Sequence, residues 1–213
     1  RAEDQERGPD EMHGTGGPLA VSDMRIRREI CDRFIDAAVE LGYPARDDFN
    51  GEEQEGAGYF QLTARNGLRC STAVGYLRPA KSRENLTVET HAHTHRILIE
   101  NNRAVGVRYD VKGRLREARA RGEVVLSAGA IGSPQILTLS GIGPGSKLQD
   151  LGVDPVAESR DVGGNLQDHL QVRMVFKTKQ PITLNDQVNN PVKKAMMGLE
   201  FLLHRRGPLT MGA

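Results

Sequence analysis

The chain has 213 residues, enough for one large domain or two small ones. Its net charge of +1 excludes the basic footprint of a nucleic-acid-binding protein, and no apolar run approaches the ~20 residues of a membrane span. Because only 38% of the residues are hydrophobic and none is Trp, we expect apolar faces that pack against partners outside the chain.

Two cysteines, Cys31 and Cys70, lie far apart and belong to no paired motif. This spacing favours reduced thiols in a cytosol-like compartment, although one disulfide stays open. The first residues are polar and give no sign of a signal peptide. We expect a cytoplasmic protein, with peripheral attachment to an inner membrane left open.

The first predicted elements are a loop and a helix. Residues 1–21 are rich in Gly, Pro and acidic residues, which predicts a loop. A helix should follow, capped by Ser22 or Asp23 and ended by Gly42 and Pro44. Its apolar stripe at helical spacing should pack into a core. The stripe consists of Ile26, Ile30, Phe34, Ala37 and Leu41.

Residues 45–70 are crowded with carboxylates and predict a solvated acidic loop, since their spacing does not match a calcium loop. A short helix should begin at Ser71 or Thr72 and end near Pro79. Alternating apolar residues then predict a β-meander. Its strands are centred on residues 86–90, 97–99, 105–109 and 115–120, with turns at 101–102 and 112–113.

Residues 123–143 predict a buried strand at 124–126, a bend of small residues, and a helix capped by Ser133 that starts at Pro134 and ends at Gly141. The bend holds Ser127, Ala128 and Gly129, so a backbone or a flat ligand could approach closely. By itself this pattern predicts only a strand–helix unit.

The last part of the chain predicts a short helix at 146–151, a polar loop at 161–169 and a strand at 172–176. A longer helix should carry the apolar residues of 192–203, with His204, Arg205 and Arg206 in its last turn.

Other patterns in the sequence could form a metal site or a catalytic site. The alternating His91, His93 and His95 would share one face of a strand and could bind zinc or nickel, but a His-rich edge strand is the favoured interpretation. We therefore expect no metal site. Asp168–His169 is a weak triad fragment, because adjacent side chains point in different directions. Three serines lack the Gly-x-Ser-x-Gly setting of a hydrolase nucleophile. They are Ser71, Ser133 and Ser140.

The exact string of residues 129–143, Gly-Ala-x-x-Ser-Pro-x-Ile-Leu-x-x-Ser-Gly-Ile-Gly, resembles the second signature of the glucose–methanol–choline (GMC) family of FAD-dependent oxidoreductases. Further matches extend the resemblance from His13 to Gly212. They are Gly14 to Leu19, the Gly67-x-Arg69-x-Ser71 segment to Leu77, residues 85–88, residues 103–107, and Gly164 to His169.

The resemblance implies an α/β fold with an α+β substrate part, that is, an FAD-binding sheet domain interleaved with a sheet-plus-helix substrate domain. The expected division assigns residues 1–68 and 163–213 to the substrate domain and residues 69–162 to the FAD-binding domain. The family's Gly-x-Gly-x-x-Gly fingerprint and its catalytic His region have no counterpart in these residues. We therefore assign no catalytic residue to this chain.

The resemblance further implies that Thr94 contacts the adenine of FAD through its backbone, and that Ala128 and Gly129 lie close to the adenosine. Thr94 should then lie beside Ala128 or Gly129. The implied activity is oxidation of a primary alcohol, choline-like or aliphatic, to an aldehyde by hydride transfer to flavin. Quinone or oxygen would accept the electrons, no nucleic acid is involved, and the oligomeric state stays open. The alternative is a catalytically silent fragment or a structural piece.

Overall fold

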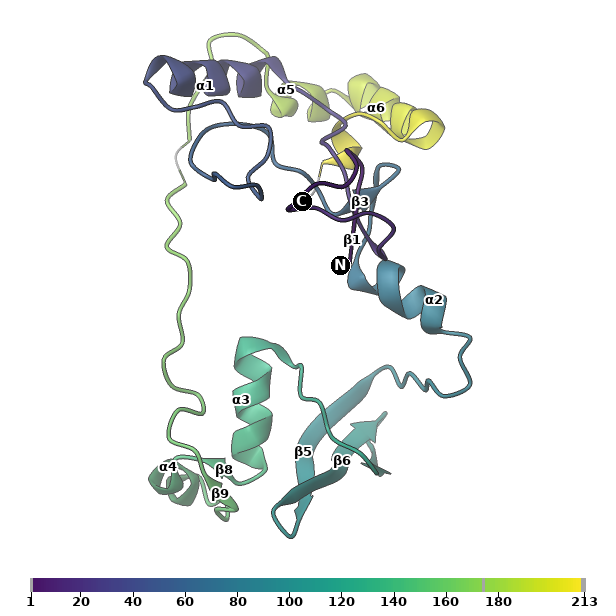
Figure 1. Cartoon of the computed structure of the whole chain (residues 1–213), viewed down its shortest axis with the longest axis vertical. Coiled ribbons are helices and arrows are strands. Elements are labelled where there is room, and N and C mark those ends of the chain that lie inside the picture. The colour runs from purple at the N-terminus through teal and green to yellow at the C-terminus, as the bar shows by residue number, and fades with distance from the viewer. Residues whose placement is uncertain (1, 174, 212–213) are drawn as a thin grey trace. The chain divides into compact units, whose positions relative to one another are not determined.

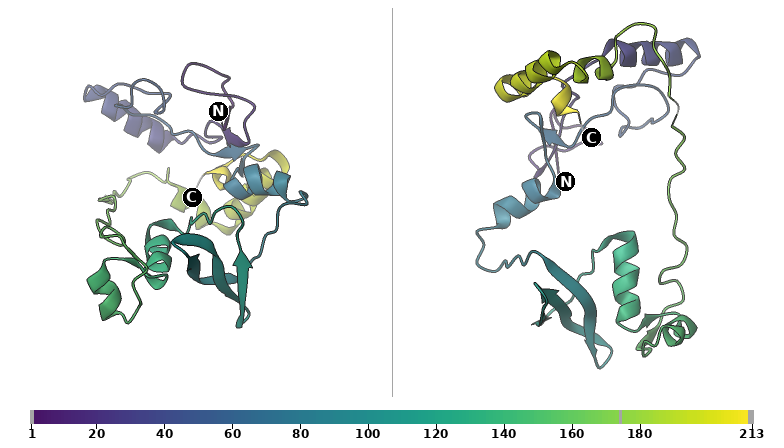
Figure 2. Two further views of the ribbon diagram at one scale, coloured as in Figure 1. Left: turned by 60° about the horizontal axis from the view of Figure 1, so that its bottom comes forward. Right: turned by 180° about the vertical axis from the view of Figure 1, so that it is seen from behind.

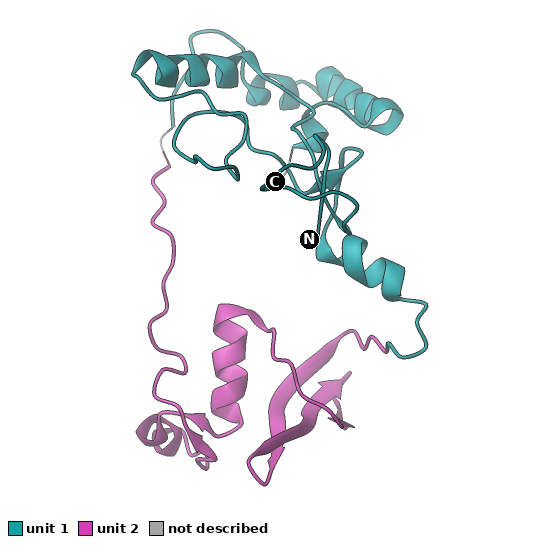
Figure 3. Ribbon diagram, in the orientation of Figure 1, with its two compact units in different colours: residues 1–86, 174–213 teal, residues 87–173 magenta. Residues whose placement is uncertain are grey.

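The structure is a computed structural model that describes residues 2–173 and 175–211. It is a mixed α/β chain with two compact units, residues 1–86 with 174–213 and residues 87–173 (Figure 3). Figure 1 labels many of the elements of each unit. The first unit contains β1 (Glu3–Gln5), β2 (Leu19–Val21), α1 (Glu29–Glu40), β3 (Ala64–Arg65), β4 (Leu68–Arg69), the π-helix η1 (Ala73–Leu77), α2 (Arg78–Ala80), α5 (Leu184–Val188), α6 (Pro191–His204) and the 3-10 helix η2 (Pro208–Thr210). The second contains β5 (Ala92–Glu100), β6 (Arg103–Val111), β7 (Arg114–Arg119), α3 (Gly129–Leu139), β8 (Ile142–Gly143), α4 (Gly145–Asp150) and β9 (Ala157–Glu158).

The N-terminal segment is more ordered than the predicted loop. β1 and β2 form a parallel pair in which Glu3 lies opposite Leu19 and Asp4 lies opposite Ala20. Ala20 is buried. Strands of three residues are too short to show an alternating pattern, so their pairing is a tertiary effect that local periodicity does not reveal.

α1 begins at Glu29, so the prediction of a cap at Ser22 or Asp23 was wrong. Ser22 instead exchanges backbone hydrogen bonds with Leu62. The helix start is fixed from a distant loop, because the Tyr59 hydroxyl accepts the N–H of Arg28 at 3.2 Å and donates to Asp32 at 2.9 Å. The helix ends as predicted, just before Gly42 at φ +94°.

The apolar stripe of α1 does not enter a core, contrary to the prediction. No residue of α1 is buried, and Phe34 is 73% exposed. Few large apolar side chains are buried anywhere in the described residues, where only Leu148 and Cys70 lie below 2% exposure. Most apolar side chains on α1 and α6, such as Phe34 and Val192, therefore stay exposed in the part of the chain that the structure describes.

The short helix predicted at residues 71–79 is confirmed as η1 followed by α2, with the hydroxyl of Ser71 accepting the N–H of Val74 at 3.4 Å. The acidic loop before it holds the antiparallel pair β3–β4. Within the described residues, no group of three or more His, Cys, Asp or Glu could hold a metal ion. Both cysteines are free thiols.

The meander is confirmed in the second unit, where β5, β6 and β7 form an antiparallel sheet with turns at 101–102 and 112–113 (Figures 1 and 2). The strands predicted at 86–90 and 124–126 were wrong, and Val125 is 76% exposed. A parallel strand takes its hydrogen bonds from flanking strands. No described strand pairs with either segment.

α3 begins at Gly129, four residues before the predicted cap, and Pro134 lies inside it. The helix ends at Gly141 as predicted. Gly141 has φ +81°, and a Cβ there would lie 2.5 Å from the carbonyl oxygen of Asp154. Only glycine lets the chain turn into the parallel pair β8–β9 at this point.

The helix predicted at 146–151 is confirmed as α4 and the one at 192–203 as α6. Asn190 caps α6 by accepting the N–H of Val192 at 3.0 Å, and Arg205 ends it in a left-handed conformation. The strand predicted at 172–176 was wrong for the described positions, and its Met174 lies outside the described residues. None of the helices in the described residues has the length and apolar character to cross a membrane.

Candidate functional site

The bend between β7 and α3 presents bare main chain to solvent. Ala128 is the residue before the helix. Gly129 is the first residue of the helix and has φ +82°. Both residues are exposed. A Cβ added to Gly129 would have no heavy atom within 4 Å, so the space in front of this glycine is open. A flat group can therefore lie against the backbone here.

The bend is held by a side chain from the helix that follows it. The hydroxyl of Ser133 accepts the N–H of Ala128 at 3.0 Å. Ser133 thus accepts the N–H of Ala128, the residue before the helix, and is not the cap of a helix that begins at Pro134. The other N–H groups of the first turn are left for solvent or a ligand, and the positive end of the helix dipole adds to their attraction for negative charge.

Thr94 lies on β5 and is half-buried. Its ladder partner is Tyr109, and the register shifts between Thr94 and Arg96, so that His95 is an extra residue. A bulge of this kind interrupts the ladder and re-aims nearby groups. The strand that carries Thr94 and the helix that follows Gly129 pack side by side in the second unit (Figures 1 and 2).

Ser140 joins these two elements. Its hydroxyl accepts the N–H of Ile97 at 2.8 Å and donates to the carbonyl of Ile136 at 2.6 Å. Ser140 is 7% exposed and Ile97 is 8% exposed. The hydroxyl thereby accepts an N–H on the outer edge of β5 that would otherwise need a carbonyl of another strand. Sequence reasoning excluded Ser140 as a nucleophile and missed this role.

Replacing Ser140 by Ala should lower the free energy of unfolding by about 1–3 kcal/mol, because the buried N–H of Ile97 loses its acceptor. Urea unfolding followed by circular dichroism measures this change. Ser146→Ala on α4 removes an exposed hydroxyl and is the matched control, expected to change stability by less than about 0.5 kcal/mol. Equal stability of the two variants would show that the Ser140 bridge is not stabilising.

The three alternating histidines do not share one face. His91 has φ +56° and lies before β5. The rings of His93 and His95 meet edge to face at 5.3 Å, and His95 Nε2 lies 3.1 Å from Asp110 Oδ2. The N–H of Gly113 and the His95 ring lower the pKa of Asp110. The interpretation as a His-rich surface strand fits this geometry.

Asp168 and His169 do not form a triad fragment. The carboxylate of Asp168 accepts the backbone N–H of His169 at 2.8 Å, and both residues are exposed. Asn165 in the same loop has φ +53° and is exposed as well. This loop shows no polar cluster aimed at a common point.

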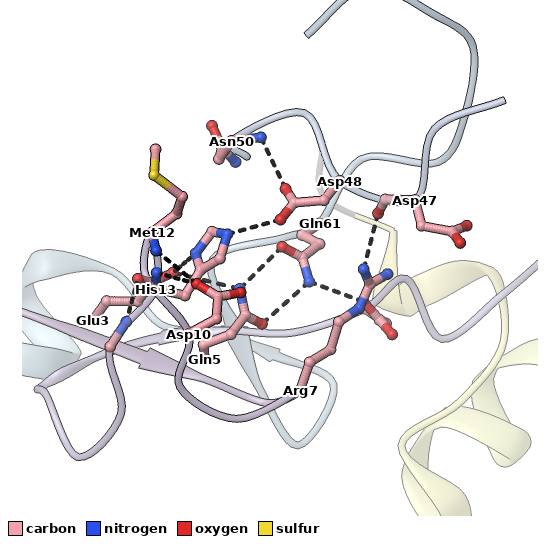
Figure 4. A network of polar contacts seen from close by, with 12 residues as sticks. Glu3, Gln5, Arg7, Asp10, Met12, His13, Asp47, Asp48, Asn50 and Gln61 are labelled. Atoms are coloured by element: carbon pink, nitrogen blue, oxygen red, sulfur yellow. Dashed lines mark hydrogen bonds and ion pairs between the residues drawn. The ribbon is translucent and has the colours of Figure 1, made fainter. Parts of the chain in front are cut away.

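The most developed polar cluster lies in the first unit around His13 (Figure 4). His13 is 6% exposed, and its two ring nitrogens each contact a carboxylate. Nδ1 lies 3.0 Å from Glu3 Oε1, and Nε2 lies 2.7 Å from Asp48 Oδ2. Two carboxylates on opposite edges of one ring require both nitrogens to carry protons, so the arrangement fits an imidazolium.

Hydrogen bonding explains the pKa shifts in this cluster. The hydrogen bond to Glu3 is the largest cause that raises the pKa of His13, and Asp48 raises it further against the opposing effect of burial. The N–H of Asn50, followed by His13, lowers the pKa of Asp48. Each partner therefore stabilises the charged form of the other.

The His13 cluster continues through a chain of side chains that joins β1 to residues 47–61 (Figure 4). Gln5, which is 4% exposed, pairs with the amide of Gln61 at 3.1 Å. Gln61 in turn donates to Asp23 at 3.0 Å, which accepts from Arg7 at 2.8 Å. Sequence reasoning missed this network, because its members are far apart along the chain.

Comparison with known proteins identifies the family to which the chain belongs. Residues 2–171 match the family model described as GMC oxidoreductase. The oxygen-dependent choline dehydrogenase 1 of Chromohalobacter salexigens is 45% identical over 97% of this chain and 37% of its own length. The mitochondrial choline dehydrogenase of Homo sapiens is 42% identical over 95% of this chain and 34% of its own length. The chain thus spans about a third of these relatives.

A solved structure confirms the fold. An FAD-dependent oxidoreductase from Chaetomium thermophilum superposes with a TM-score of 0.88 over 98% of this chain and 39% of its own, at 24% identity. The mixed α/β fold predicted from the sequence is therefore that of FAD-dependent relatives. With the family model matching most of its length and choline dehydrogenases as homologues, the chain belongs to the GMC oxidoreductase family.

Proposed function

We propose that this chain is the middle part of an FAD-dependent enzyme that oxidises a primary alcohol, choline-like or aliphatic, to an aldehyde. Membership of the GMC family and the choline dehydrogenases among its homologues support the reaction class. FAD, when bound, supplies the hydride acceptor. Quinone or oxygen would reoxidise it.

The observation that carries the cofactor proposal is the open bend at Ala128 and Gly129. A side-chain-poor turn before a helix lets a flat adenosine approach main chain and the first N–H groups of α3. The bend is exposed and free of packed side chains, so the residues present fit the group. Thr94 would contribute its backbone from β5.

The domain roles follow from the same proposal. Residues 69–162 would form the adenosine side of the FAD domain, and residues 1–68 and 163–213 would belong to the substrate domain. The catalytic groups would lie outside this chain, because the family's catalytic His region has no counterpart in its residues. A catalytically silent fragment remains the second candidate, favoured by the chain spanning about a third of its relatives.

The experiment is to express the protein from its complete reading frame and record its absorbance spectrum. We expect a yellow protein with the two flavin bands, which bleach when a primary alcohol is added without an acceptor. A screen of choline, long aliphatic alcohols and polyols with an artificial acceptor, repeated with oxygen, identifies the substrate and acceptor. A colourless protein that takes up no added FAD would contradict the proposal and favour the silent fragment.

A further inference from the structure

A second feature of the first unit is a cavity of about 890 Å³ between the start of α1 and α6. Its size is in the range of small-molecule sites. Apolar side chains, among them Ile26, Met196 and Met197, form part of its wall. Cations dominate its charged lining, with Glu29 and Glu200 as the carboxylates. The cations are Arg25, Arg27, Arg28, Lys193 and Arg206.

The positive charges in this cavity are poorly compensated. The guanidinium of Arg28 donates only to neutral acceptors, the side chain of Gln187 at 3.2 Å and the carbonyl of Ile182 at 3.3 Å. Arg25 reaches a carboxylate of Glu6 only at 3.8 Å. Among residues 2–173 and 175–211, the buried Nε atoms of Arg25 and Arg28 find no hydrogen-bond partner. Buried donors and charges without partners cost free energy, and an anionic acceptor placed against them would reduce that cost.

The remaining cations are also weakly paired. The hydrogen bonds of Thr183 and, to a smaller extent, the charge of Lys193 lower the pKa of Asp186, so Asp186 is a partial counter-charge of Lys193. Within the described residues, Lys193 and Arg206 take part in no ion pair. Arg27 faces the ring of Tyr59 at 5.2 Å instead of a carboxylate. The lining holds five cations and two carboxylates. Even with Glu6 near Arg25 and Asp186 near Lys193 counted, the cavity keeps a net positive charge, which attracts anions and repels a quaternary ammonium group such as that of choline.

We propose that this cavity binds an anionic amphiphile, a small molecule with a carboxylate or phosphate head and an apolar body. Guanidinium groups match the geometry of both heads and can bind either through two hydrogen bonds. The apolar body would lie against Ile26, Met196 and Met197, where thioether side chains adapt to irregular shapes. The inference does not depend on the alcohol oxidation proposed above.

Isothermal titration calorimetry of the protein expressed from its complete reading frame tests the proposal. It uses three probes of one tail length, each below its critical micelle concentration. Octanoate and octyl phosphate carry the two candidate heads, and octyltrimethylammonium carries the opposite charge. We expect saturable binding of at least one anion at one site, weakened by added salt, and no binding of the cation. The anion that binds with the higher affinity identifies the preferred head group. Equal binding of the cation, or no binding of either anion, would overturn the proposal.

Charge-neutral variants locate the site. Lys193→Gln and Arg206→Gln should each weaken binding of the preferred anion about tenfold, because each removes one charge-assisted contact. Neither residue forms an ion pair in the described structure, so neither change should disturb folding, which circular dichroism checks. Lys194→Gln is the matched control on the same helix, outside the cavity lining. If Lys194→Gln weakened binding of the anion equally, the effect would come from the overall charge of the protein, and the proposed site would be wrong.

Discussion

Replacing His13 by Leu should lower the free energy of unfolding by about 3 kcal/mol, the low end of the range for breaking a buried ion pair. The ring is 6% exposed and separates two carboxylates. Without the imidazolium, Glu3 and Asp48 would face each other across a partly buried space. Their side chains are 23% and 28% exposed, which lets water reduce the cost.

The stability that His13 contributes should depend on pH. Its pKa is raised above 6.5 in the folded chain, so its contribution is complete below about pH 6.5 and is lost as the pH rises through the folded value. The pKa of Asp48 is lowered below 3.8, so its contribution is complete above about pH 3.8 and is lost as the pH falls through the folded value. The cluster should stabilise most between these limits.

Urea unfolding at a series of pH values separates the charge from the packing. The free energy of unfolding of the native chain should fall as the pH rises from 6.5 toward 9. In the His13→Leu variant this fall should be absent, because no imidazolium is left to lose its proton. His13→Gln retains hydrogen-bond donors without the charge and should lie between the two. His169→Leu removes an exposed histidine and serves as the control. If the stability of the native chain were constant over this range, His13 would not be a stabilising imidazolium.

The sequence predicted those elements whose information is local. The period-two pattern of residues 97–120 and its Asn-Asn and Lys-Gly turns gave the meander β5–β7. The apolar residues at helical spacing in 192–203 predicted α6. The wrong strand predictions at 86–90 and 124–126 share one cause. A strand there would need hydrogen bonds from neighbouring strands, and no described strand pairs with either segment.

The candidate sites divide in the same way. The bend at Ala128–Gly129 could be found from the sequence, because a run of small residues before a helix is a local signal. His13 could not, because its carboxylate partners stand 10 and 35 residues away and no spacing rule connects them. The Ser140 bridge to Ile97 spans 43 residues and was missed for the same reason. Contacts of this kind become visible only once the chain is folded.

Replacing Gly129 by Leu in the protein from the complete reading frame should lower its affinity for FAD by at least about tenfold. The side chain would project into the open space where we place the adenosine. It would also strain the backbone at φ +82°, at a cost of about 1–2 kcal/mol. Flavin absorbance per mole of protein and a titration with FAD after its removal measure the effect.

A second glycine separates blockage of the site from backbone strain. Gly152, at the end of α4, has φ +66° and open space in front of its Cα, so Gly152→Leu carries a similar strain without facing the bend. It should keep its FAD affinity within about twofold, since a small shift in stability far from a site leaves the ligand contacts unchanged. If the two variants lost FAD to the same extent, folding and not adenosine contact would explain the loss. If neither lost FAD, the adenosine would have to lie elsewhere, because a leucine cannot share the space in front of residue 129 with a bound ring.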